Sequence, residues 1–144
     1  MSFPAPKAGL VIRYAFLWSH EEDAGAQEAS KDRPCAIVIA APRRDGGDLR
    51  VIVAPVTHAP PGDPSDSLEL PPTVCRSLGL DGGRHWLRLD ELNQFSWPGY
   101  DLRTIPGKPG IFAYGVLPQS LFEQIRRSIL ERQRVKALRI QGRD

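Results

Sequence analysis

The chain has 144 residues, and its 19 lysines and arginines against 17 aspartates and glutamates leave a formal net charge of only +2. The length predicts a single domain, residues 1–144, and near-neutrality argues against nucleic-acid binding through charge spread over the whole surface. The 13 glycines and 14 prolines exclude a bundle of long helices and favour short strands joined by turns.

The first predicted strand, residues 10–18, carries Ile12, Tyr14, Phe16 and Trp18 on one face. The acidic segment that follows, residues 19–32, is expected to be a long exposed loop. The later elements, in chain order, are strands over 35–41, 51–56 and 67–70, one or two helical turns over 73–78, and strands over 86–89 and 111–117. Gly46-Gly47 predicts a hairpin between the second and third strands.

A helix is predicted at the end of the chain. Ser120 and Glu123 have the spacing of a capping box. An apolar stripe follows at helical spacing, formed by Leu121, Phe122, Ile125 and Ile129. Strands followed by one amphipathic helix predict a mainly β fold, a small antiparallel barrel or curled sheet with the helix packed on it.

The charge is concentrated near this helix, because residues 118–144 hold seven basic and three acidic side chains. There are two interpretations of these basic residues. They form a solvated helix face, or they form a positively charged surface that binds phosphate or an acidic partner protein.

Signals for export and metal binding are missing. No segment approaches the roughly 20 apolar residues that span a bilayer, and Arg13 interrupts the first apolar stretch, which lacks the features of a signal peptide.

Cys35 and Cys75 have no CxxC partner, and Cys35 lies in an apolar run typical of a buried structural thiol. The three histidines lie in separate segments. These features predict a soluble cytoplasmic protein with no metal site.

Two short segments could carry chemistry, although no standard catalytic motif is present. Arg33 stands where the polar segment enters a strand, and Thr57 stands where the next strand ends. If the two strands pair as a hairpin, these side chains are neighbours, and a guanidinium beside a hydroxyl is suited to a phosphate and to charge developing on it. The alternative is that Arg33 pairs with Asp32 or a loop carboxylate, while Thr57 merely ends a strand.

The order and spacing of these segments resemble the MazF/PemK family of toxin endoribonucleases from bacterial toxin–antitoxin systems. The resemblance covers residues 9–135. It rests on Gly9-Leu10-Val11, Arg33-Pro34 before Cys35-Ala36-Ile37-Val38-Ile39, Ala54-Pro55-Val56-Thr57, Gly79-Leu80 and Leu89-Asp90-Glu91-Leu92-Asn93. Each of these motifs is short and individually weak.

The resemblance implies an SH3-like barrel with a C-terminal helix, a homodimer, and an antitoxin whose disordered tail fills the RNA groove. It also implies cleavage of single-stranded RNA without metal or cofactor, by attack of a ribose 2′-hydroxyl that leaves a 2′,3′-cyclic phosphate and a 5′-hydroxyl. In this mechanism Arg33 stabilises the phosphorane and Thr57 donates to a phosphate oxygen.

Further candidate residues surround this pair. His58 follows Thr57 directly and could act as a general base. Lys31, Trp18 and Asn93 are candidate substrate-binding residues, Trp18 because an indole can stack on a base. Asn93 stands where the family commonly has arginine, and the acidic segment 19–32 would repel RNA. A non-catalytic barrel that binds nucleic acid or an antitoxin-like protein is therefore the alternative function.

Overall fold

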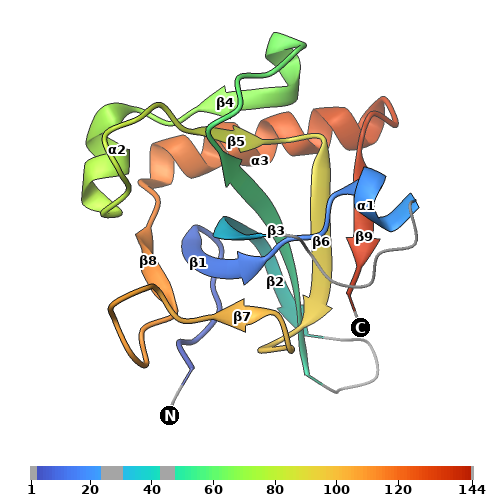
Figure 1. The fold of residues 1–144 in the computed structure, drawn as a ribbon. Helices are drawn as coiled ribbons and strands as arrows, with labels where there is room; N and C mark the ends of the chain where they lie inside the picture. Colours follow the sequence, from blue (N-terminus) through green and yellow to red (C-terminus); the bar gives the residue numbers. More distant parts are fainter. Residues whose placement is uncertain (1–2, 24–30, 43–47, 144) are drawn as a thin grey trace.

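The computed structural model describes residues 3–23, 31–42 and 48–143, and this part of the chain is mainly β, as predicted (Figure 1). The elements in chain order are β1 (Leu10–Ala15), α1 (Ser19–Asp23), β2 (Asp32–Pro42), β3 (Leu49–Thr57), a 3₁₀ turn (Pro64–Asp66), β4 (Ser67–Glu69), α2 (Pro72–Ser77), β5 (Trp86–Arg88), β6 (Glu91–Ser96), β7 (Leu102–Arg103), β8 (Ala113–Val116), α3 (Gln119–Arg134) and β9 (Arg139–Gly142). No helix within these ranges is long and apolar enough to cross a membrane.

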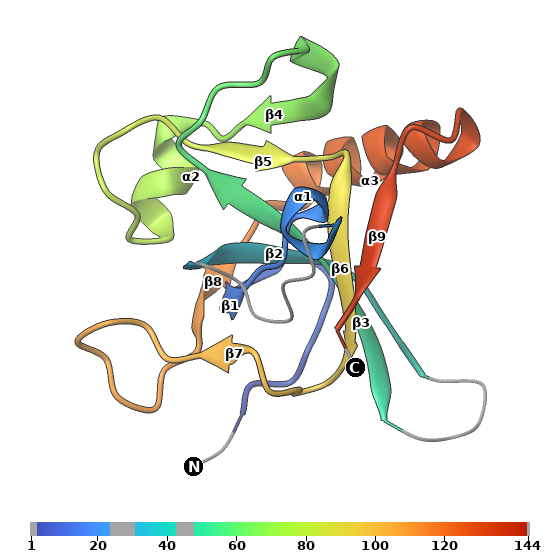
Figure 2. The ribbon, with the colours of Figure 1, turned by 45° about the vertical axis from the view of Figure 1, so that its right-hand side comes forward.

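The strands form one sheet around the central antiparallel pairs β1–β2 and β2–β3. On one side β1 pairs with both β7 and β8, and on the other β3 pairs with both β5 and β6. The outer strands are β4, next to β5, and β9, which runs parallel to β6. No ladder between described residues joins the two sides, so of the two expected forms, a barrel or a curled sheet, the structure has the curled sheet and the barrel is not closed (Figure 2).

The centre of the sheet is buried on both faces. Along β2, Ala36 and Val38 belong to a cluster that includes residues of α2 and α3, whereas Cys35 and Ile37 belong to a second cluster on the opposite face. Every consecutive side chain from Cys35 to Val38 is therefore buried, which explains why this strand appears in the sequence as an unbroken apolar run.

Helix α3 packs behind the sheet in Figure 1 and buries Leu121, Ile125 and Ile129. Its start differs from our expectation. The helix begins at Gln119, with Pro118 at the N-cap, and no side chain caps it. Ser120 therefore already lies inside the first turn, where its hydroxyl is past the capping position, and the predicted capping box is wrong.

Five further elements correct the sequence analysis. The helix α1 occupies the start of the segment expected to be loop, and β1 ends at Ala15 rather than at residue 18. Strands β6, β7 and β9 were not predicted, and β9 lies beyond residues 9–135, the range that the family resemblance covers. The predicted Gly46-Gly47 hairpin turn lies outside the described residues.

Gly9, the first residue of the family-like motifs, has a structural reason to be glycine. Its φ is +92°, a conformation that other residues rarely adopt. In this conformation its N–H donates to the Ile37 carbonyl and its own carbonyl accepts from the Leu117 N–H, both at 2.8 Å. Gly9 thereby ties the entry of β1 to β2 and to the end of β8.

Both thiols are expected to be inert in the folded protein. Cys35 and Cys75 are free and buried, and burial raises the pKa of each, which suppresses the reactive thiolate. A colorimetric disulfide reagent should therefore titrate two thiols in denaturant and react only slowly under native conditions. Rapid modification of the folded protein, at a rate near that of free cysteine, would contradict the buried positions.

Candidate functional site

A cavity of about 680 Å³ opens where β2 begins and β3 ends. Its walls come from β1, β2, β3, β8 and the loops before β5 and β8. The polar side chains that line it are Arg13, Lys31, Asp32, Arg33, Thr57, His58, Asp81, His85 and Tyr114. Four of the six predicted site residues, namely Lys31, Arg33, Thr57 and His58, thus lie on one cavity.

The pairing of β2 with β3 brings Arg33 and Thr57 to the same end of the sheet. The last antiparallel pair at this end is Cys35 with Pro55. Arg33 and Thr57 each lie two residues beyond it, and there Arg33 pairs with Tyr14 and Thr57 with Trp86. The two strands therefore separate at this point, and both side chains line the opening between them.

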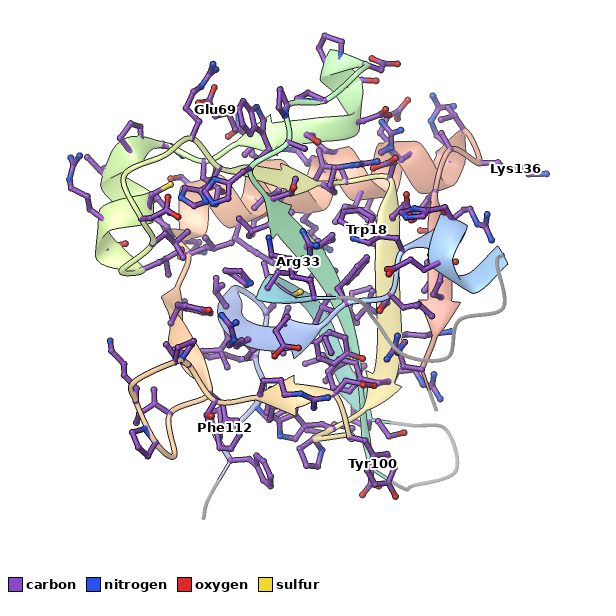
Figure 3. All side chains as sticks on the ribbon, in the orientation of Figure 1. Trp18, Arg33, Glu69, Tyr100, Phe112 and Lys136 are labelled. Atoms are coloured by element: carbon purple, nitrogen blue, oxygen red, sulfur yellow. The ribbon has the colours of Figure 1, made fainter. Side chains whose placement is uncertain are left out.

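Arg33 is partly buried and lies within the electrostatic influence of the Glu21 carboxylate. Its guanidinium lies 5.1 Å from the centre of the Trp18 ring, and the two residues are seen together near the middle of Figure 3. Its buried Nε has no hydrogen-bond partner, and within the described ranges it forms no ion pair. Asp32, the neighbour that could have neutralised it, lies instead 3.9 Å from Arg103. Burial lowers the pKa of Arg33, although a guanidinium retains its charge in proteins.

Thr57 and His58 are held by short local contacts. The Thr57 hydroxyl oxygen accepts from the Ala59 N–H at 3.1 Å, which orients the hydroxyl at the strand end. The His58 ring is fixed at both nitrogens, because Nδ1 lies 3.0 Å from the Arg84 carbonyl oxygen and Nε2 lies 3.2 Å from Asp81 Oδ2.

His85 and Asp81 complete this group, and the sequence analysis missed both. The ladder between β3 and β5 pairs Val56 with Leu87 and Thr57 with Trp86, so His58 and His85 occupy the next opposed positions. Their ring centres are 4.4 Å apart, and His85 Nε2 lies 3.2 Å from Asp81 Oδ1. The Gly83 N–H donates to Asp81 Oδ1 and, with the two histidines, holds the pKa of Asp81 below its usual value.

The two other predicted residues lie away from the cavity wall. The Trp18 ring lies beneath Arg33 and is also contacted by the Arg88 guanidinium, at 5.2 Å from its centre. Asn93 is fully buried, and its amide binds the Leu17 backbone in both directions. In this structure Asn93 joins β6 to the chain after β1 and has no access to the cavity.

Arg13 and Tyr114 are further cavity residues that sequence reasoning did not single out. Arg13 Nη1 donates to the Tyr114 hydroxyl at 3.0 Å, between β1 and β8. The cavity therefore has three cationic side chains, Arg13, Lys31 and Arg33, against the two carboxylates of Asp32 and Asp81.

The basic C-terminal segment is largely neutralised. At least four of its seven basic residues form ion pairs with described residues, namely Arg126 with Glu123, Arg132 with Asp66, Arg134 with Glu131 and Arg143 with Asp101. The arrangement favours a salt-bridged surface over a free phosphate-binding footprint, so the cavity is the better candidate for an anionic ligand.

The fold and cavity define a mainly β protein with a small cationic site at one end of its curled sheet. No family model matches the chain, and no curated protein or solved structure matches it either. The resemblance to the MazF/PemK family therefore stays a prediction from the short sequence motifs.

Proposed function

We propose that the protein is a metal-independent endoribonuclease that cleaves single-stranded RNA in the cytoplasm. One observation carries the proposal: Arg33, which forms no ion pair within the described residues and whose Nε lacks a hydrogen-bond partner, shares a cavity with Thr57 and His58. A guanidinium with no direct ion pair can bind a phosphate, and a ring nitrogen in the same cavity is suited to accept a proton.

The proposed reaction needs no group beyond these side chains and water. His58 Nε2 accepts the proton of a ribose 2′-hydroxyl as the 2′-oxygen bonds to the adjacent phosphorus. The bond from phosphorus to the 5′-oxygen breaks, and this oxygen takes a proton from water to leave as a 5′-hydroxyl. The other product is a 2′,3′-cyclic phosphate.

Each residue has a distinct role in this scheme. Arg33 stabilises the negative charge that builds on the phosphorane oxygens, and Thr57 donates to one of them through its hydroxyl. Asp81, 3.2 Å from His58 Nε2, stabilises the imidazolium that forms when the ring accepts the proton. Lys31 and Arg13, which also line the cavity, would contact flanking phosphates.

The same cavity offers a reason for the proposed partners. An antitoxin with an acidic disordered segment would compete with RNA for Arg13, Lys31 and Arg33, so its binding would inhibit cleavage. A homodimer, as the family likeness implies, would carry two such cavities.

The decisive experiment incubates the purified protein with a mixed-sequence RNA in EDTA and identifies the ends of the products. We expect 2′,3′-cyclic phosphate and 5′-hydroxyl ends from the unaltered protein, and a rate lowered by about 10²-fold in Thr57→Ala, which loses one donor to the phosphorane. Thr73→Ala is the matched control, because Thr73 is exposed on α2, away from the cavity.

Two results would contradict the proposal. Cleavage that disappears in EDTA would exclude the metal-independent mechanism. Binding of RNA without cyclic-phosphate product would instead favour a non-catalytic barrel that binds nucleic acid, with an affinity that falls steeply as salt is added.

A further inference from the structure

His58, Asp81 and His85 gather three metal-binding side chains on one wall of the cavity. One potential ligand atom from each residue lies within 4.8 Å of the other two. From this cluster we propose that the protein binds one divalent transition-metal ion, with Zn²⁺ the best fit, through the imidazoles of His58 and His85 and the carboxylate of Asp81.

The donor set matches the chemistry of zinc. Two imidazole nitrogens and one carboxylate oxygen form an open zinc site in which water occupies the fourth position. Tetrahedral ligands about 2.0–2.2 Å from the ion lie roughly 3.3–3.5 Å from one another. Each histidine Nε2 is already 3.2 Å from a different oxygen of Asp81. His85 Nε2 also lies 3.2 Å from the Asp81 backbone carbonyl oxygen, so metal binding requires that the hydrogen of His85 moves to Nδ1 and that the side chains rotate to draw the three ligand atoms together from within 4.8 Å.

The surroundings of His58 provide a second, independent argument. The Arg84 carbonyl can only accept, so His58 Nδ1 carries a hydrogen directed to it. In the neutral ring, Nε2 then presents a lone pair to the Asp81 carboxylate, and two acceptors face each other at 3.2 Å. A cation between them removes this repulsion, and a backbone carbonyl on the second ring nitrogen is a common outer contact of metal-bound histidine.

Burial and support also suit an open site. The His85 side chain is 5% exposed, whereas His58 and Asp81 are 55% and 65% exposed, so one ligand is fixed in the wall and two face solvent. The Gly83 N–H holds Asp81 Oδ1 in place. An ion can therefore enter from the cavity and retain a water ligand on that side.

Metal binding has a consequence that rests on the proposed function. The ion would occupy His58 Nε2, the atom that accepts the 2′-hydroxyl proton, so Zn²⁺ would inhibit RNA cleavage rather than support it. Binding itself needs no RNA, so the metal site and the ribonuclease activity can fail independently.

Calorimetric titration of the untagged, EDTA-dialysed full chain with Zn²⁺ tests the site. We expect one ion per chain and at least about a tenfold loss of affinity in His58→Ala and Asp81→Asn, each of which removes a ligand. The visible absorption of Co²⁺, used as a second probe, should report tetrahedral coordination that both variants lose. Both substitutions are at exposed positions, so folding, checked by circular dichroism, should persist; His85→Ala is a third variant at the buried position.

His20→Ala is the matched control, because His20 lies on α1, outside the cluster. Unchanged Zn²⁺ affinity in His58→Ala and Asp81→Asn, or loss of binding in His20→Ala, would overturn the assignment. The absence of saturable binding to the unaltered chain would also overturn it.

Discussion

RNA cleavage is expected to fall by about 10²- to 10³-fold in Arg33→Ala, the loss typical of removing one donor to a developing oxyanion. The reason is local. Arg33 lines the same cavity as Thr57 and forms no ion pair within the described residues, and its buried Nε has no hydrogen-bond partner there. The initial rate of cleavage of a labelled RNA in EDTA measures the effect. Arg33→Lys should recover only part of the rate, because an ammonium keeps the charge but not the planar fork.

Arg88→Ala is the matched control for this experiment. Arg88 contacts the same Trp18 ring as Arg33, but its guanidinium pairs with Asp90 at 2.7 Å. If the Arg33 effect came only from disturbing Trp18, Arg88→Ala would reproduce it. Cleavage at an undiminished rate in Arg33→Ala would remove Arg33 from the mechanism.

The sequence predicted the strands wherever local pattern and tertiary burial agree. The run from Cys35 to Val38 predicted a buried strand because it is covered on both faces, and the alternation of Ile12, Tyr14 and Phe16 predicted β1 because one face enters the second cluster. By contrast, β9 is exposed at most positions and is held by parallel pairing with β6, so its sequence has no apolar periodicity to detect.

The sequence predicted the site residues only where they lie on two strands that follow one another in the chain. Arg33 and Thr57 follow from the single assumption that β2 and β3 form a hairpin. His85 and Asp81 needed knowledge that β5, almost 30 residues further along, returns to β3 in the register that opposes Thr57 to Trp86. No local pattern specifies such a pairing, so three histidines in separate segments appeared unrelated.

Asn93 has a role in the structure that differs from the role its motif position predicted. Its place in the family-like segment suggested contact with substrate. In the structure its Oδ1 accepts from the Leu17 N–H and its Nδ2 donates to the Leu17 carbonyl, both at 2.9 Å. Leu17 precedes Trp18, so these bonds also fix the ring that lies beneath Arg33.

Replacing Asn93 with alanine is accordingly expected to lower the free energy of unfolding by about 2–4 kcal/mol, because the Leu17 N–H and carbonyl are left unpaired in a buried position. Denaturant unfolding followed by circular dichroism measures this change. Gln94→Ala is the control on the same strand, since Gln94 is partly exposed and should change stability by less than about 1 kcal/mol. Loss of cleavage in Asn93→Ala with unchanged unfolding would instead assign Asn93 to substrate binding. Destabilisation, with cleavage retained in the fraction that remains folded, would establish that Asn93 supports Trp18 and the wall behind Arg33.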